Sequence, residues 1–290
     1  MSKDIHKKKH LSSFQLIILG FAGVILLGAI ILMLPVSSAE GVMTPFNQTL
    51  FTSTSAVCVT GLAVLDTGSY WSVFGQVVIL LLIQIGGLGV VTVAVSVFML
   101  SGRKISLMQR STMQNAISAH KVGGIVRLTK FILKGTLFIE MAGALALLPV
   151  FYHDFGRKGI WMAVFHSISA FCNAGFDILG TPANPFPSIT AYAGNPIVNV
   201  VIMFLIIAGG IGFLTWEDIC INKIHFRKYH MQSKIIFVTT ALLIVLPAVF
   251  FFFSDFTHLS VGKRLLASVF QAVTPRTAGF NTMDISKMTE

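Results

Sequence analysis

Apolar residues fill this chain in long blocks that few polar residues interrupt. Five blocks have the length and composition of membrane-spanning helices: Phe14–Leu34, Tyr70–Leu100, Phe131–Tyr152, Asn195–Trp216 and Ile235–Phe253. Only the third block contains charged residues, Lys134 and Glu140. About 20 apolar residues are enough for a helix to cross the hydrocarbon core of a bilayer. The pattern therefore predicts an all-α integral membrane protein with five spans.

The charged residues lie between these blocks and are unevenly distributed. Charged residues make up 11% of the 290 residues, against about 25% in a typical soluble domain. Lysine and arginine gather before the first span and in the segments 101–130 and 217–234, whereas 35–69 has neither. This alternation predicts a multi-pass protein of the cell membrane with a cytoplasmic amino terminus. Because topology accounts for the net charge of +10, nucleic-acid binding is not expected.

Three short segments between the spans cannot cross the membrane. They cover residues 46–57, 160–171 and 264–273, and about 12 helical residues reach only ~18 Å. Each is followed by a turn that ends in glycine. Non-helical backbone at membrane depth is tolerated only where protein buries it or water bathes it. The order of span, short helix, turn and span predicts a re-entrant pore loop.

The pore-loop pattern repeats along the chain. FTSTSAVCVTGL (51–62) matches FHSISAFCNAGF (165–176), and FQAVTPRTAGF (270–280) ends in the same way. IQIGGLGVVT (83–92) likewise matches IIAGGIGFLT (206–215). We therefore expect tandem helix–pore-loop–helix repeats that resemble a potassium-channel pore. The expected division is a cytoplasmic amino terminus (1–13), repeat 1 (14–100), a cytoplasmic linker (101–127), repeat 2 (128–216), a second linker (217–234) and a partial repeat 3 (235–290).

The repeated turns are the candidate functional site. Glycine accepts dihedral angles that let a backbone line up its carbonyl groups, and rings of carbonyls can replace the hydration shell of potassium. The carboxyl ends of the three short helices would add partial negative charge. The residues predicted to form a potassium filter are Cys58, Val59, Thr60, Gly61, Cys172, Asn173, Ala174, Gly175, Thr277, Ala278 and Gly279.

Polar residues near the turns have competing interpretations. Asp177 is a candidate pore-mouth residue that concentrates cations, whereas Asp66 is expected to be a solvated cap. Arg276 is expected to donate hydrogen bonds to loop carbonyls, and His166 to be a packed polar residue. Glu140 either relays cations or pairs with a neighbouring helix or with Lys134.

Other motifs restrict the function further. The glycines of GGLG and GGIG favour close helix packing, with a flexible gate as the alternative. An odd number of cysteines, at positions 58, 172 and 220, argues against a disulfide framework. Candidate catalytic side chains are scattered among different spans, and no Walker-type motif occurs in the sequence. We therefore expect no enzymatic activity, no metal site beyond the transported monovalent cation, and no cofactor.

Five segments carry a resemblance to a known family: TSAVCVTGLAVLDTG, QIGGLGVVT, SISAFCNAGFD, AGGIGF and FQAVTPRTAGFN. They resemble the KtrB-like membrane subunit of the bacterial Trk/Ktr potassium uptake systems. This resemblance implies four repeats around one pore, selective potassium uptake, and sodium as a possible coupling (symport) or activating ion. It also implies a homodimer among membrane lipids and a cytoplasmic nucleotide-binding regulatory ring that is KtrA-like.

The resemblance leaves three functional alternatives open. Residues 285–290 leave no room for the second span of repeat 3, so a chain truncated after its third pore loop is expected. One alternative is selective potassium uptake as part of a complete pore. The others are a non-conducting fragment or assembly partner, and a sodium-permeable relative.

Overall fold

The computed structural model describes residues 12–100, 112, 114, 125–257 and 259–283. Its helices are α1 (Ser13–Met33), α2 (Phe46–Val57), α3 (Val73–Leu88), α4 (Val90–Leu100), α6 (Ile125–Phe155), α7 (Lys158–Phe171), α8 (Pro196–Gly210), α9 (Phe213–Asn222), α10 (Met231–Phe253) and α11 (Val261–Val273). Short 3₁₀ turns cover Pro35–Ser37, Thr190–Tyr192 and Phe226–Lys228. The described part of the chain contains no β-sheet, and its two β-bridges are isolated. The all-α prediction is confirmed.

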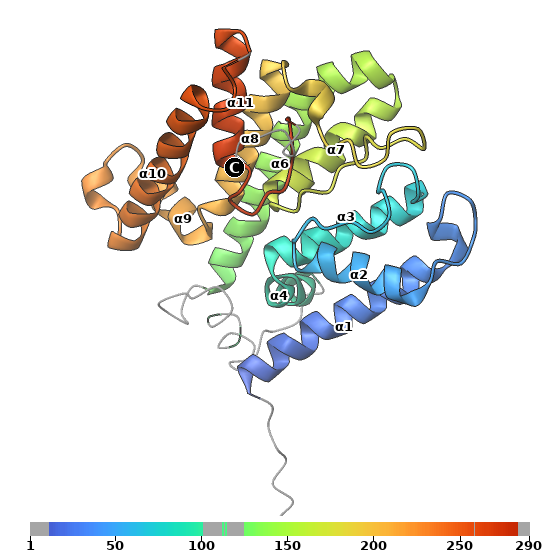
Figure 1. The fold of residues 1–290 in the computed structure, drawn as a ribbon. Helices are drawn as coiled ribbons and strands as arrows, with labels where there is room; N and C mark the ends of the chain where they lie inside the picture. The colour runs from blue at the N-terminus through green and yellow to red at the C-terminus, as the bar shows by residue number, and fades with distance from the viewer. Residues whose placement is uncertain (1–11, 101–111, 113, 115–124, 258, 284–290) are drawn as a thin grey trace, which may run out of the picture.

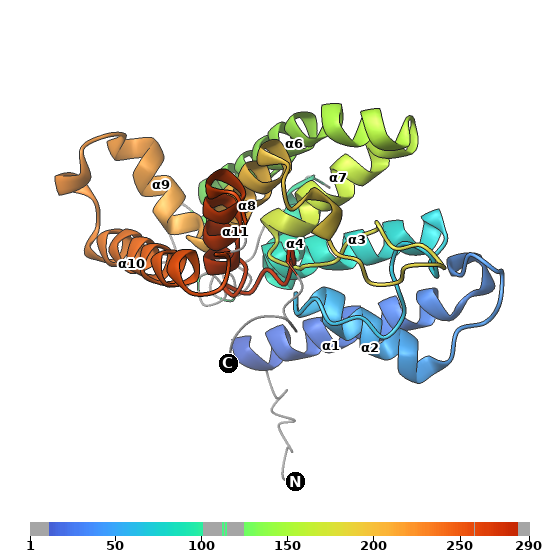
Figure 2. The same cartoon turned by 45° about the horizontal axis from the view of Figure 1, so that its top comes forward.

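The helices form two similar sets and the start of a third (Figure 1). A long helix, a short helix and another apolar helix follow one another as α1–α2–α3 and as α6–α7–α8, and α10–α11 begins the same order. Among the residues that the structure describes, three helices are long and apolar enough to cross a membrane, over Phe14–Met33, Val126–Phe155 and Met231–Phe253. Figure 2 shows the carboxyl ends of α2, α7 and α11 turned toward the middle of the molecule.

Two of the predicted spans are not single helices. The expected span Tyr70–Leu100 is broken at Gly89, and the span Asn195–Trp216 is broken at Gly212. Both glycines have φ of 82°, which a helix cannot contain and which glycine adopts at little steric cost. At the second break α8 and α9 are bent by 99°. The third glycine of GGLG therefore follows the end of α3, and the third glycine of GGIG precedes the start of α9.

The three short segments between the spans are helical. α2 covers the predicted residues, α7 begins two residues earlier than predicted, and α11 begins at Val261 rather than Arg264. The predicted linker 101–127 lies mostly outside the described residues.

Bulky apolar side chains fill the space around the short helices. Trp71, Phe151, Phe165, Phe270 and Phe280 are among the largest fully buried side chains. By contrast, none of the 18-residue apolar window of α10 is buried. Leucine, valine and phenylalanine on the outside suit lipid, because a hydrocarbon solvent does not penalise exposed apolar surface. The packed core therefore lies at the centre, where the short helices end.

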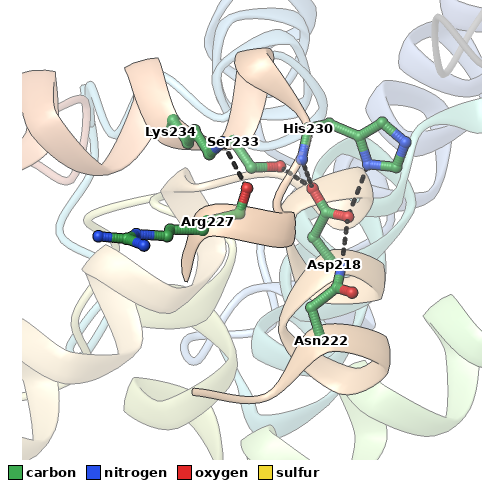
Figure 3. Close-up of polar contacts among 6 residues, drawn as sticks. All are labelled: Asp218, Asn222, Arg227, His230, Ser233 and Lys234. Carbon is green, nitrogen blue, oxygen red and sulfur yellow. Dashed lines mark hydrogen bonds and ion pairs between the residues drawn. The ribbon is translucent and has the colours of Figure 1, made fainter. Parts of the chain in front are cut away.

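A buried carboxylate joins α9 to α10 (Figure 3). Asp218 accepts hydrogen bonds from the backbone N–H of His230 at 3.0 Å, from its Nδ1 at 2.6 Å, and from Ser233 Oγ at 2.5 Å. Asn222 Nδ2 donates to the same carboxylate at 3.3 Å. His230 is the residue that precedes α10, so Asp218 supplies that helix with a cap from a neighbouring helix.

Candidate ion-conduction site

The three glycine turns, residues 58–61, 172–175 and 276–279, meet at one place. A Cβ added to Gly61 would lie 2.5 Å from the carbonyl oxygen of Ala174. A Cβ added to Gly175 would overlap the carbonyl oxygen of Ala278, and one on Gly279 would lie 3.7 Å from the Cα of Gly175. The turns of the first, second and third repeats are therefore neighbours in that order, although they are far apart in sequence.

One cavity touches all three turns. It has a volume of about 330 Å³ and is lined by Cys58 and Val59, by Cys172 and Asn173, and by Thr277. The remaining lining residues come from the helices that carry the turns and from the glycine motifs of α3 and α8: Gly86, Gly87, Phe171, Gly209 and Phe213. The same position of each turn, represented by Val59, Asn173 and Thr277, thus faces a common space.

The backbone angle φ alternates in sign along each turn. Positive φ occurs at the glycine and at the residue two positions before it: Val59 (55°) and Gly61 (77°), Asn173 (57°) and Gly175 (68°), Thr277 (74°) and Gly279 (75°). Valine and threonine rarely adopt such angles, because their branched side chains clash there. Three copies of the same strained pattern indicate that the backbone conformation itself is required. Alternating hand is a way to present successive peptide groups to one side.

Hydrogen bonds tie the N–H groups of each turn to the preceding short helix. The residue before each glycine donates its N–H to a carbonyl one helical turn back: Thr60 to Ser55 at 2.9 Å, Ala174 to Ser169 at 2.8 Å, and Ala278 to Thr274 at 3.1 Å. The hydroxyls of Ser169 and Thr274 also donate to the carbonyls of Phe176 and Phe280, at 2.7 and 2.5 Å. In the first repeat Thr60 Oγ1 bonds Ser55 Oγ at 2.9 Å.

These bonds leave the carbonyl oxygens of the turns without donors. Within the residues that the structure describes, no protein group donates to the carbonyls of Val59, Thr60, Asn173, Ala174, Thr277 or Ala278. Asn173, Ala174 and Ala278 are buried residues, and buried carbonyls without a partner are rare and require an explanation. Carbonyl oxygens are suitable ligands for alkali cations, and the nearby carboxyl ends of α2, α7 and α11 carry partial negative charge.

Comparisons with known proteins identify the family of this chain. The family model described as TrkH, a cation transport protein, matches residues 13–290. The chain belongs to the TrkH family of cation transport proteins. It is 40% identical over 287 residues to the potassium/sodium uptake protein NtpJ of Enterococcus hirae, covering 97% of this chain and 62% of that protein.

Other members of the TrkH family extend this comparison. The chain is 41% identical over 283 residues to the Ktr system potassium uptake protein B of Bacillus subtilis, covering 95% of this chain and 62% of that protein. It therefore spans about 62% of the length of these relatives. The crystal structure of the potassium transporter TrkH from Vibrio parahaemolyticus matches its fold with a TM-score of 0.58 at 15% identity, covering 93% of this chain and 52% of that one.

The paired glycines of this TrkH family chain bring helices close to the turns. A Cβ on Gly86 would overlap the carbonyl oxygen of Val57, and one on Gly209 would overlap that of Phe171. A Cβ on Gly87 would lie 2.6 Å from the Sγ of Cys172. The packing interpretation of these glycines fits the structure, whereas Gly89 and Gly212 interrupt the helices.

Two expectations about charged residues near the turns are wrong. Asp66 is buried rather than solvated: it accepts hydrogen bonds from the backbone N–H of Ser69 at 2.7 Å and of Phe186 at 2.8 Å. Phe186 lies 120 residues further along the chain. Arg276 donates to Thr240 Oγ1 on α10 at 3.1 Å, and not to loop carbonyls.

The remaining candidate residues have clear positions. Asp177 is half-buried in the connection after α7, where burial raises the pKa of its carboxyl group to about 6. A hydrogen bond from the N–H of Leu179 opposes this shift, and the nearby charge of Asp66 adds to it. His166 is fully buried, with its Nδ1 2.7 Å from the carbonyl oxygen of Met162, as a packed polar residue would be. All three cysteines are free.

Glu140 pairs with a residue that the sequence analysis did not single out. Its carboxylate accepts from Gln84 on α3, while Lys134 is exposed and forms no ion pair with it. Ser55, Ser169 and Thr274, which support the turns, were also missed. Aligning the first two turns by their glycines places Ser55 and Ser169 at one position, six residues before the glycine, whereas Thr274 lies five residues before Gly279.

Proposed function

We propose that this chain supplies three of the turns of a potassium-selective filter, in a protein that takes up potassium across the cell membrane down its electrochemical gradient. The observation that carries this proposal is the set of three turns around one cavity, with carbonyl oxygens to which no group in the described part of the chain donates. Such oxygens can replace the water around a potassium ion. The names of the relatives in Enterococcus hirae and Bacillus subtilis support the same substrate.

The proposal assigns a role to each part of the site. The carbonyls of residues 59–61, 173–175 and 277–279 are ligands of the dehydrated ion, and the ends of α2, α7 and α11 attract the hydrated ion into the cavity. Asp177 concentrates cations at the outer mouth. Gly279 has no carbonyl of another turn beside it among the described residues, so a fourth turn would fit between Gly279 and Gly61.

The assembly and its regulation are extensions of this proposal. The basic segments 101–127 and 217–234 support a cytoplasmic amino terminus and cytoplasmic linkers. A homodimer among membrane lipids, with a KtrA-like nucleotide-binding ring on the cytoplasmic side, is supported by the relatives that are named as Ktr system components. Sodium as a coupling or activating ion is supported by the name of the Enterococcus hirae relative.

Growth at limiting potassium tests the proposal directly. A bacterial strain that lacks its own potassium uptake systems would produce either this chain alone or the complete reading frame that contains it. We expect the complete protein to restore growth and rubidium uptake, with sodium competing weakly. Equal competition by sodium would favour the sodium-permeable alternative, and the absence of rubidium uptake by the complete protein would refute the proposal.

A further inference from the structure

A carboxylate lies deep inside the membrane-spanning part of the protein and has a neutral partner. Glu140, in the middle of α6, is 5% exposed. Gln84 Nε2 donates to its two oxygens at 2.9 and 3.2 Å. Both oxygens face one donor, and an ionised carboxylate, which only accepts hydrogen bonds, fits this arrangement. An ionisable residue at this depth is expensive and usually marks a functional position.

Gln84 connects this carboxylate to the second glycine turn. Its Oε1 accepts a hydrogen bond from Cys172 Sγ at 3.7 Å. Cys172 is the first residue after α7, lines the cavity beneath the turns, and packs against Gly87 of α3. A continuous chain of polar contacts therefore runs from α6 through α3 to the cavity.

The carboxylate fixes which way the Gln84 amide points. An amide can be turned over, exchanging its donor and acceptor ends. An acceptor-only group at residue 140 holds Nε2 toward itself, so that Oε1 must face the thiol. A neutral amide at residue 140 would not impose this choice, because it offers a donor as well as an acceptor.

The first repeat shows that packing alone does not need this pair. Ser167 Oγ donates to the carbonyl oxygen of Glu140 at 2.6 Å, and Ser53 Oγ donates to that of Ile25 at 2.7 Å. Isoleucine thus occupies the equivalent position of the first repeat.

The close contacts around that position are also shared by the two repeats. A Cβ on Gly143 would lie 2.5 Å from Ser167 Oγ, and a Cβ on Gly28 would lie 2.5 Å from Ser53 Oγ. In the matched motifs IQIGG and IIAGG, Gln84 corresponds to Ile207. Each position therefore accepts an aliphatic side chain in another repeat, Ile25 in place of Glu140 and Ile207 in place of Gln84.

We propose that Glu140, acting through Gln84, is a positioning residue that fixes the second glycine turn and thereby contributes to cation selectivity. Only the contribution to cation selectivity rests on the proposed function. The positioning of the second glycine turn can be measured without transport. The chemistry is that of a charge-assisted hydrogen bond that orders an amide, which in turn orders a thiol at the wall of the cavity.

The first measurement follows the reactivity of Cys172 in native membranes. The complete protein and its Glu140→Gln variant would be treated with N-ethylmaleimide, and labelling of each cysteine would be followed by peptide mass spectrometry. We expect Cys172 to react about tenfold faster in the variant, the scale of one lost charge-assisted hydrogen bond. Cys58 and Cys220 serve as internal references whose rates stay constant. Glu40→Gln, the same change at an exposed site, should leave all three rates unchanged.

The second measurement is the preference for potassium over sodium in uptake. We expect Glu140→Gln to reduce this preference by about tenfold, with Glu40→Gln again unchanged. If Glu140→Gln does not accumulate in the membrane, the proposal is tested with the exchange variant, which combines Gln84→Glu with Glu140→Gln. It restores one carboxylate, one amide and an acceptor for the thiol, so Cys172 should be labelled at about the wild-type rate.

Each outcome separates the two proposals. Unchanged Cys172 labelling and unchanged selectivity in Glu140→Gln, or fast Cys172 labelling in the exchange variant, would overturn the positioning role. If the labelling responds as expected but the unmodified protein takes up no potassium, the positioning role stands and the proposed function fails.

Discussion

Gly61 faces the carbonyl oxygen of Ala174, so closely that a Cβ on the glycine would lie 2.5 Å from it. Residues 113 positions apart in sequence therefore lie side by side. The same relation joins Gly175 to Ala278. Because φ alternates in sign in the same way in the three turns, these contacts join repeated units and are not accidental.

The paired glycine of α3 should be intolerant of any side chain. Gly86→Ala would push a methyl group into the carbonyl oxygen of Val57 and displace the end of α2. We expect a loss of about 1–3 kcal/mol in the free energy of unfolding, as for other overpacked sites, measured by thermal unfolding in detergent. Gly23→Ala is the matched control, because a Cβ there meets nothing within 4 Å. Equal stability of the two variants would contradict the close approach.

The Asp218 cap should hold α9 against α10. Asp218→Asn removes a charged acceptor of the hydrogen bonds from the His230 backbone and from Ser233. We expect a loss of about 1–3 kcal/mol of stability and faster proteolysis of residues 223–230. Asn222→Ala, which removes only the 3.3 Å bond, should have a smaller effect. An equally stable Asp218→Asn variant would show that the cap contributes nothing.

External pH should change potassium uptake through Asp177. Burial raises the pKa of this carboxyl group to about 6, so its charge is present at about pH 7.5 and is lost as the pH falls through about 6. If the charge concentrates cations, the KM for potassium should rise severalfold between these conditions. Asp177→Asn should have a high KM for potassium at both pH values. A pH dependence that survives in Asp177→Asn would assign it to another group.

The Asp177 charge that favours potassium uptake should make the folded protein less stable. A raised carboxyl pKa means that the fold favours the neutral form, so ionisation above about pH 6 destabilises the folded protein. Asp177→Asn should therefore raise the Tm at about pH 7.5 and leave it unchanged near pH 4. A variant less stable than the unmodified protein at about pH 7.5 would show that the charged form is favoured.

The sequence revealed the turns because they are repeated. Gly61, Gly175 and Gly279 align in three copies, and a local pattern of short helix followed by glycine predicted both the helices and the turns. The breaks at Gly89 and Gly212 were missed, since a run of glycines in an apolar block has the same composition whether it packs closely or changes direction. Only the backbone angle distinguishes the two.

The partners of buried polar residues were harder to predict. Asp66 binds the N–H of Phe186, which is 120 residues away, and no local pattern contains that information. Gln84 is one of two amides in a long apolar block, and its pairing with Glu140 depends on how α3 lies against the second repeat. Arg276 was expected to bind nearby carbonyls, but its side chain reaches α10 instead.

The central claim concerns the carbonyl ring, and cation selectivity of a turn variant tests it most directly. Gly175→Ser places a side chain against the carbonyl of Ala278 at a φ of 68°. Gly156→Ser is the matched control, since Gly156 also has a positive φ, of 57°, but has open space around it. In the complete protein, we expect Gly175→Ser to reduce the preference for potassium over sodium by about tenfold or more and Gly156→Ser to leave it unchanged. Wild-type selectivity in a well-expressed Gly175→Ser variant would contradict the account.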